Sequence, residues 1–432
     1  MRRWLIIAAL LCTAIVAAGC GGGSDNGGTS ANGVVTLKFW PGQNDIPKQA
    51  LDTLVARFNA THPHIHISSD SGGVLADEML TKVTAALASG SYPDIAYIYG
   101  SDLANLARSS KVLDLTDTVN RPSFGWNEFW PAERQAATVD GKVRAIPALT
   151  DNLAVIYNPK LFDQAGLPYP KADWTWDDYR AIARKLTNAA TGTFGAAWPG
   201  AGGEDTTWRL WPMLWQQGGD ILAPDGKKAA FDSPQGVGAL TLVNQMATVD
   251  KSIYVDPDPN SEHMQQLFVN GKLGMLIGGP WSLPDMVAAH EKYGVVQMPG
   301  YNGDHTTIAG PDNWVIFDNG GARTQAAITF VTWLTDPAQD VVWDRATQSL
   351  PLRRTTLASP AYKAYAKTIV GMDLFAKNLV NARARPTIGT YPQISHAVGE
   401  AIVGSLLGRT KPADGLKQAE QSANSALSGA PY

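Results

Sequence analysis

The sequence has little charge and almost no cysteine. Asp, Glu, Lys and Arg make up 17% of its 432 residues, the formal net charge is −4, and the only two cysteines are at positions 12 and 20. There is no basic run and no aromatic signature of an RNA-binding domain, so nothing indicates a nucleic-acid partner. The sequence also lacks a Gly-x-Ser-x-Gly nucleophile motif, a phosphate-binding loop and a zinc-binding helix motif. No motif therefore indicates a serine hydrolase, a nucleotide-hydrolysing enzyme or a zinc protease.

Long hydrophobic runs are also missing, apart from one short run at the N-terminus. Arg2 and Arg3 precede an apolar region at residues 4–18. This order is typical of a signal peptide, and the run is too short and wrongly flanked for a permanent membrane helix. It ends in Val16-Ala17-Ala18-Gly19-Cys20, which resembles the cleavage box of bacterial lipoproteins, although alanine stands at 17 where leucine is usual. An ordinary secretory signal peptide that is cut elsewhere is the alternative.

The lipoprotein interpretation predicts how the mature chain begins. Residues 1–19 would be the signal peptide, and Cys20 would carry the lipid. Because Cys12 would leave with the signal peptide, no cysteine would remain for a disulfide or a thiolate metal site. Residues 20–33 are mostly glycine, serine, asparagine and aspartate, which predicts a flexible tether. We therefore expect an extracytoplasmic protein that is anchored to the cell membrane by lipid.

From residue 34 on, short apolar strands alternate with amphipathic helices. A strand is expected at residues 34–40, a turn followed by a strand at residues 92–99, and helices at about residues 47–58 and 79–90. This alternation predicts βαβ units and a parallel sheet, with the loops after successive strands at one edge. Open α/β sheets bind ligands at that edge. The length and the 44% hydrophobic content are enough for two or more lobes.

Three local features are also predicted. Ser101 can cap the helix that follows the strand ending at residue 99. Thr175 and Asp178 are spaced as a capping box, so the neighbouring Trp174 and Trp176 are expected to be packing residues. Trp208 and Trp211 are three residues apart, which would place them on one face of a helix.

Residues 269–281 predict a helix end, a turn, a buried strand and a glycine-rich loop. Gly271 suits the left-handed residue after a helix that Ser261 can cap, and Leu273–Ile277 is short and apolar. The glycines at 278 and 279 and the following proline end the strand and leave Trp281 at its carboxyl edge. Trp281 could be a core residue. Because the glycines leave an open face for its ring, we expect it in a ligand site.

The same stretch carries a resemblance to a known family. Phe268-x-x-Gly271-Lys272-x-x-Met275, followed by Gly279-Pro280-Trp281, resembles the middle of the extracellular solute-binding proteins of ABC importers, the maltose-binding-protein-like family. That resemblance implies a two-lobed α/β fold of the periplasmic-binding-protein type (type II), with a cleft between the lobes. Residues 34–147 with about 308–345 would form the N-terminal lobe. Residues 148–307 with about 346–428 would form the C-terminal lobe.

The resemblance also implies a function. The protein would capture a carbohydrate, such as a di- or oligosaccharide, and deliver it to the transmembrane permease subunits of an ABC importer, reaching the cytoplasmic ATPase only indirectly. It would be a monomer without cofactor or metal ion, and not an enzyme. His62, His64 and His66 could share a strand face and suggest a metal site, but no carboxylate or cysteine supports them locally.

Tryptophans and polar loop residues are predicted to line the cleft. The 14 tryptophans are many for a chain with so few charges. Indole rings stack on the C–H faces of sugars, while carboxylates and amides meet the hydroxyls. The resemblance places a stacking ring at Trp208 and a structural ring at Trp211, an assignment that could be reversed. The predicted ligand contacts are Trp40, Gln43, Asn44, Ser71, Ser101, Asp102, Thr150, Asp151, Asn152, Trp208, Trp281, Gly310, Asp312, Tyr391 and His396.

Two other functions remain open at this point. Residues 350–351 and 391–394 also resemble binding proteins for glycerol 3-phosphate or a glycerophosphodiester. Those proteins use an arginine where this chain has Thr387, although Arg383 and Arg385 are close in sequence. Paired carboxylates such as Asp151 and Asp312 could instead cleave a glycosidic bond in a lipid-anchored enzyme.

Overall fold

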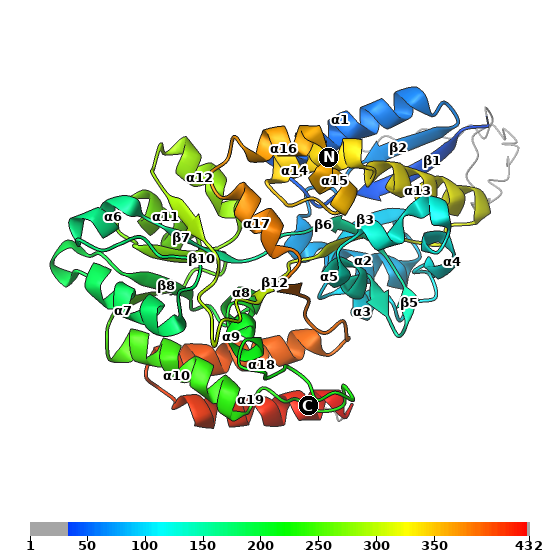
Figure 1. The fold of residues 1–432 in the computed structure, drawn as a ribbon. Helices are drawn as coiled ribbons and strands as arrows, with labels where there is room; N and C mark the ends of the chain where they lie inside the picture. Colours follow the sequence, from blue (N-terminus) through cyan, green and yellow to red (C-terminus); the bar gives the residue numbers. More distant parts are fainter. Residues whose placement is uncertain (1–32, 430–432) are drawn as a thin grey trace, which may run out of the picture.

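The computed structural model describes residues 33–429 and shows two α/β lobes side by side (Figure 1). The predicted signal peptide, the lipidation site at Cys20 and nearly all of the tether lie outside the described residues. Among residues 33–429, no helix has the length and apolar character needed to cross a membrane.

The first lobe is built on a five-stranded sheet. β1 pairs in parallel with β2 and β3, while β13 lies between β3 and β6 and runs antiparallel to both. The sheet order is β2 (Ile65–Ser69), β1 (Val35–Trp40), β3 (Ile95–Tyr99), β13 (Asp312–Ile316), β6 (Ile146–Leu149). Its helices are α1 (Asp45–Thr61), α2 (Ala76–Ser89), α3 (Leu103–Leu106), α4 (Thr116–Val119), α5 (Pro131–Ala136), α13 (Gly321–Leu334) and α14 (Pro337–Thr347), with 3₁₀ turns η1 (Pro122–Phe124) and η2 (Trp126–Glu128) and the hairpin β4 (Thr138–Val139)–β5 (Lys142–Val143).

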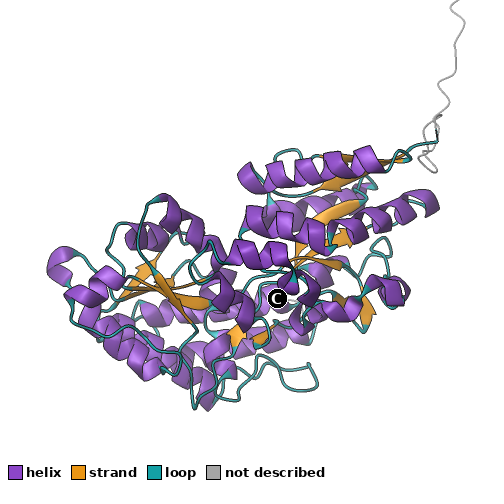
Figure 2. Cartoon of the chain, turned by 45° about the horizontal axis from the view of Figure 1, so that its top comes forward, coloured by secondary structure: helices purple, strands orange, loops and turns teal. Residues whose placement is uncertain are grey.

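The second lobe is built on an antiparallel three-stranded sheet and a parallel strand pair. The sheet order is β10 (Met275–Gly278), β7 (Ala154–Tyr157), β11 (Gly294–Val296), and β8 (Ala196–Pro199) pairs with β9 (Ile253–Asp256). Its helical elements are α6 (Pro159–Gln164), α7 (Trp176–Leu186), η3 (Ala189–Thr191), α8 (Glu204–Trp208), α9 (Trp211–Trp215), α10 (Pro234–Thr248), α11 (Glu262–Val269), η4 (Pro280–Ser282), α12 (Leu283–Ala288), α18 (Tyr391–Leu406) and α19 (Pro412–Leu427). In Figure 2 the strands of the two lobes form two separate groups.

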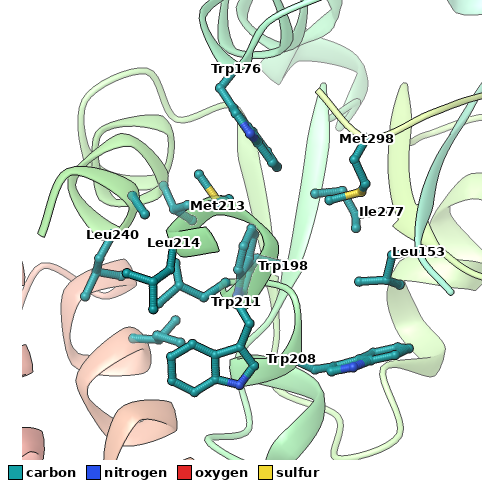
Figure 3. Close-up of a cluster of buried hydrophobic side chains, with 14 of the residues drawn as sticks. Leu153, Trp176, Trp198, Trp208, Trp211, Met213, Leu214, Leu240, Ile277 and Met298 are labelled. Atoms are coloured by element: carbon teal, nitrogen blue, oxygen red, sulfur yellow. The ribbon is translucent and has the colours of Figure 1, made fainter. Parts of the chain in front are cut away.

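Each lobe has its own main apolar core, and the strands of the second lobe are covered on both faces. Val155 and Ile277 pack into a tryptophan-rich core with α7, α9 and α10 (Figure 3), whereas Ile156 and Leu276 pack into another cluster. That cluster includes side chains from α16 (Pro360–Ala366) and α17 (Met372–Asn378), which follow α15 (Arg354–Ala358). Burial on both faces explains why the sequence of β10 is continuously apolar.

Three chain segments meet at the junction between the lobes. Thr150 pairs with Leu350, and Asn152 pairs with Ala309, each as an isolated antiparallel bridge. The Gly310 amide donates to the Asp151 carbonyl oxygen over 3.0 Å. A short parallel pair, β12 (Thr307–Ile308) with β14 (Ala382–Arg383), lies beside this crossing. The junction is therefore held by backbone hydrogen bonds between segments far apart in sequence.

Several local predictions are confirmed. α1 buries Leu51, Leu54, Val55 and Phe58, and Gly271 adopts a φ of +65° after α11. Thr175 and Asp178 form the expected capping box at the start of α7, and the neighbouring Trp174 and Trp176 are buried packing residues.

Other local predictions are wrong. Ser261 makes no side-chain capping bond to α11, because its Oγ donates to Asp205 Oδ2 over 2.5 Å. Asp102, rather than Ser101, is the residue before α3, and it makes no side-chain capping bond either. Trp208 and Trp211 do not share the face of one helix, since α8 ends at 208 and α9 begins at 211. Their rings point in different directions in Figure 3.

Candidate ligand-binding site

A cavity of about 530 Å³ lies between the two lobes at the junction. Its walls come from the loop after β3 in the first lobe, from α8 and the loop after β9 in the second, and from the crossing segments. Its lining residues are Tyr99, Ser101, Asp102, Asp151, Glu204, Asp205, Trp208, Pro259, Asn260, Gly310, Asp312 and Arg385. A smaller cavity of about 240 Å³ shares Ser101, Asp102 and Glu204 and extends to Tyr391, Ser395 and His396 at the start of α18.

Trp208 is the largest side chain that lines this interlobe cavity. It closes α8, is 8% exposed, and its indole Nε1 is buried without a hydrogen-bond partner among the described residues. Its ring centroid lies 5.7 Å from that of Trp281, with 31° between the ring planes. The cavity therefore has an aromatic wall, and the wall residue has a buried N–H donor whose lack of a partner is energetically costly.

Trp281 supports this wall from the neighbouring loop. Its half-buried ring packs against the second-lobe core and does not line the cavity. A Cβ at Gly279 would lie 1.8 Å from the ring, closer than any real contact. Gly279 is therefore the residue that lets the ring fold back over its own loop, whereas we expected from the sequence that the glycines would leave the ring open to a ligand.

Three acidic side chains interact at the junction: Asp151 and Asp312, which line the cavity, and the fully buried Glu133. Asp312 Oδ2 accepts a hydrogen bond of 2.6 Å from the Tyr97 hydroxyl, and Glu133 Oε1 accepts one of 2.5 Å from Thr150 Oγ1. Asp151 Oδ1 is buried and has no partner among the described residues. It packs so closely on Gly310 that a Cβ there would lie 2.0 Å from it.

Burial keeps these acids from ionising readily. It raises the pKa of Asp312 to about 7, and it raises the pKa values of Glu133 and Asp151 well above their usual range. The charge of Asp312 adds to the effect on the pKa of Asp151. Protonated carboxyls donate as well as accept hydrogen bonds, so the base of the cavity is polar without a large negative charge at neutral pH.

The basic groups near the cavity are held in ion pairs. Arg385 Nη1 contacts Glu204 Oε1 over 2.8 Å, and Arg209 Nη1 contacts Asp205 Oδ1. Arg385 also lies over the Trp208 ring, with its Cζ 5.7 Å from the ring centroid. The cavity therefore presents alternating donors and acceptors next to an aromatic face, rather than an uncompensated positive charge.

The structure brings eight of the fifteen predicted contact residues to these cavities. The main cavity contains Ser101, Asp102, Asp151, Trp208, Gly310 and Asp312, and the smaller one contains Tyr391 and the exposed His396. Thr150 and Asn152 are fully buried in the junction, where they donate to Glu133 and to the Phe375 carbonyl oxygen over 2.9 Å. These two side chains position the crossing segments instead of facing the cavity.

Five further predicted residues do not line either cavity: Trp40, Gln43, Asn44, Ser71 and Trp281. Except for Trp281, they end or follow β1 and β2, which lie on the far side of β3 from the junction. Lys82 Nζ lies 4.5 Å from the Trp40 ring centroid and donates to the Ser71 carbonyl oxygen. These loops therefore pack against α2.

Sequence reasoning missed six lining residues: Tyr99, Glu204, Asp205, Pro259, Asn260 and Arg385. Pro259 and Asn260 follow β9, so the rule that ligands bind beyond the carboxyl ends of strands could have found them. No local signal marks Glu204 or Arg385, because their pairing depends on contact between segments 181 residues apart. Among residues 33–429, no group of three or more His, Cys, Asp or Glu side chains is arranged to hold a metal ion.

Comparison with known proteins agrees with this geometry. The family model for bacterial extracellular solute-binding proteins matches residues 44–341, well over half of the chain. A binding protein of Brucella abortus is 26% identical over 86% of this chain and 88% of its own length. The sn-glycerol-3-phosphate-binding periplasmic protein of Escherichia coli O1:K1 is 23% identical over 92% of this chain and 94% of its own length.

A solved structure also matches along almost the whole chain. The cyclic α-maltosyl-1,6-maltose binding protein of Arthrobacter globiformis superimposes with a TM-score of 0.81 and 27% identity, covering 92% of this chain and all of the other. The two-lobed α/β fold predicted from the sequence is thus confirmed. The chain belongs to the bacterial extracellular solute-binding proteins and is a binding protein rather than an enzyme.

Proposed function

We propose that this protein captures a neutral oligosaccharide in the interlobe cavity and delivers it to the permease of an ABC importer. The observation that carries the proposal is the character of the cavity wall. It combines the Trp208 indole with acidic and amide side chains and lacks an unpaired lysine or arginine among its described lining residues. Sugars present C–H faces to such rings and hydroxyls to such polar groups.

The cavity has room for more than a monosaccharide and contacts on both lobes. Its volume of about 530 Å³ lies within the usual range for small-molecule sites. Asp102 comes from the first lobe and Asn260 from the second, so one ligand can contact both. The similarity to the cyclic α-maltosyl-1,6-maltose binding protein of Arthrobacter globiformis supports an oligosaccharide ligand.

A glycerol phosphate ester is the second candidate. The similarity to the sn-glycerol-3-phosphate-binding protein of Escherichia coli and the presence of Arg385 in the cavity favour it. Against it, a phosphate prefers a bidentate arginine, and Arg385 already contacts Glu204. Thr387, at the position where the sequence resemblance expects an arginine, donates instead to the Gln135 carbonyl oxygen over 3.3 Å. The pairing of Arg385 therefore favours the neutral ligand.

A thermal-shift screen followed by titration calorimetry tests the proposal. Ligand that binds only the folded state stabilises it by about 2.7 kcal/mol at a concentration of 100 times Kd. We expect maltose-type oligosaccharides, linear or cyclic, to raise the melting temperature, and sn-glycerol 3-phosphate and glycerophosphocholine to have no effect. Stabilisation by the phosphate esters alone would overturn the proposal. Unchanged sugar after prolonged incubation would agree with a binding role.

We further propose that the mature protein is a monomer held at the outer face of the cell membrane by a lipid on Cys20. The lipobox-like sequence at residues 16–20 and the glycine-rich stretch that follows support this proposal. A tether of that composition would keep the two lobes within reach of a membrane permease.

A further inference from the structure

We propose that Glu204 is a specificity-determining residue that excludes phosphate esters from the interlobe cavity by occupying Arg385. This inference rests on the proposed function, because it concerns which ligands the same cavity rejects. Arg385 is the only arginine or lysine among the residues that line the two interlobe cavities. Any phosphate that enters the cavity must therefore compete for this one guanidinium.

Arg385 is placed where a phosphate could use it. Its side chain is 10% exposed, it lines the cavity, and its Cζ lies 5.7 Å from the centroid of the Trp208 ring. A guanidinium in such a position offers a fork of N–H donors that matches phosphate oxygens. The position alone would favour a phosphate ligand, and the neighbouring carboxylate decides against it.

Glu204 is fixed against Arg385 by several donors. Its Oε1 accepts from Arg385 Nη1 over 2.8 Å and from the Tyr391 hydroxyl over 3.0 Å, and its Oε2 accepts from Ser395 Oγ. Trp211 Nε1 donates to the Tyr391 hydroxyl over 2.9 Å and so orients it. Because α18 supplies two of the donors, the carboxylate cannot swing away from Arg385 without breaking bonds to that helix.

The pair affects neutral and anionic ligands differently. A phosphate near Arg385 would meet the negative charge of Glu204 at close range, and it could reach the guanidinium only by displacing a fixed carboxylate. A sugar hydroxyl can donate to a carboxylate and accept from a guanidinium, so the intact pair is favourable for it. The Glu204 carboxylate therefore occupies the place at Arg385 that a phosphate would take, and its negative charge repels phosphate esters.

The test is to neutralise Glu204 and measure phosphate binding. Glu204→Gln keeps the shape and can still hydrogen-bond Tyr391 and Ser395. It should increase affinity for sn-glycerol 3-phosphate by about tenfold or more, the usual effect of one charge-assisted contact. Asp205→Asn is the matched control. Asp205 also lines the cavity, and its substitution removes the same charge, but Asp205 pairs with Arg209 and not with Arg385. This control should show little gain.

The double variant Glu204→Gln/Arg385→Gln shows whether Arg385 is the group that binds phosphate once Glu204 is neutralised. It removes both charges of the pair, so it should not show the increased affinity for sn-glycerol 3-phosphate. Phosphate binding by Glu204→Gln should also weaken at high salt, while binding of a neutral sugar should not. If Glu204→Gln does not fold, Glu204→Ala replaces it, and circular dichroism confirms the fold before titration.

Each outcome decides the point. A gain in Glu204→Gln that is absent in Asp205→Asn and in the double variant supports the proposal. No gain in a folded Glu204 variant, or an equal gain in Asp205→Asn, overturns it and makes the pair purely structural. Failure of the wild-type protein to bind any oligosaccharide would overturn the proposed function instead, whatever the Glu204 variants do.

Discussion

Trp208 joins the apolar core of the second lobe to the wall of the cavity, and both roles follow from its position at the end of α8. Its ring packs into the core and also lines the cavity, and its Nε1 is buried without a partner among the described residues. Trp281 lies beside it without lining the cavity. At the scale of single residues, the two tryptophans should therefore differ in how strongly they affect ligand binding.

Trp208→Ala should weaken oligosaccharide binding by about tenfold to a hundredfold, because it removes the stacking face and the N–H donor. Trp208→Phe should lose less, since it keeps a ring. Trp281→Ala should also lose less, because it acts only through the support of Trp208. Calorimetry on the folded protein measures all three. Equal affinities for wild type and Trp208→Ala would contradict the assignment of this wall.

The acids at the base of the cavity predict how stability depends on pH. The pKa of Asp312 is raised to about 7 by burial, so the folded state holds a proton that the unfolded state releases near the usual pKa of 3.8. Stability from this group is therefore fully present below the unfolded pKa and is lost as pH rises through about 7.

Asp312→Asn should remove this dependence in the unliganded protein. The amide can still accept from Tyr97, so melting temperature should fall less between pH 5 and 8 than in the wild type. Asp114→Asn is the control, because hydrogen bonds from Thr116 lower the pKa of this exposed carboxyl to about 2. Its stabilising effect is lost only as pH falls toward that value. An unchanged pH profile in Asp312→Asn would contradict the raised pKa.

At the scale of elements, the segment from β10 to η4 places the aromatic wall. β10 pairs with β7 and is buried on both faces, and η4 follows it directly. Gly279 stands between them, under the Trp281 ring. The turn works only if the backbone at this point carries no side chain.

Gly279→Ala should displace the Trp281 ring and destabilise the protein by about 1–3 kcal/mol, the usual cost of overpacking. Tryptophan fluorescence and denaturant unfolding measure the two effects. Gly278→Ala is a milder control, since its nearest contact would be Ser282 Oγ at 3.1 Å rather than a ring at 1.8 Å. Equal stability of Gly279→Ala and wild type would show that the ring moves aside freely.

At the scale of the whole molecule, the cavity walls belong to two lobes joined by crossing segments. A ligand that contacts Asp102 on one side and Asn260 on the other interacts best when the lobes approach each other. Binding should therefore favour a more closed arrangement, with bending at the junction around Asp151 and Gly310.

Small-angle scattering should show a smaller radius of gyration in the presence of a saturating oligosaccharide. For Trp208→Ala at the same ligand concentration, the radius of gyration should decrease less, because fewer protein molecules have bound ligand. At a higher ligand concentration the decrease should match that of the wild type. A radius that stays constant for a wild-type protein shown to be saturated by calorimetry would refute closure on binding.

The lipid anchor can be tested on cells. Cys20→Ser should release the protein from the membrane fraction, because the lipid has no other thiol at the predicted cleavage site. Cys12→Ser, which alters the cysteine inside the apolar run, should leave the protein in the membrane fraction. Membrane retention of Cys20→Ser in cell fractionation would be incompatible with the lipoprotein proposal.

The sequence by itself determined the features that depend on neighbours in the chain. The apolar periodicity of α1, the capping box of α7 and the glycine after α11 were read correctly, because each depends on spacings of a few residues. The alternation of strands and helices, with the motif at 268–281, was enough to predict two α/β lobes and a cleft.

Only the tertiary structure decided which polar residues meet in the cleft. Thr150 and Asn152 share the loop of Asp151, yet contacts with Glu133 and Phe375 bury their side chains in the junction. The order of the sheet moved the loops of β1 and β2 away from the cavity. Arg385 meets Glu204 across 181 residues. Such contacts depend on how the two lobes pack and cross, and local spacing carries no information about that packing.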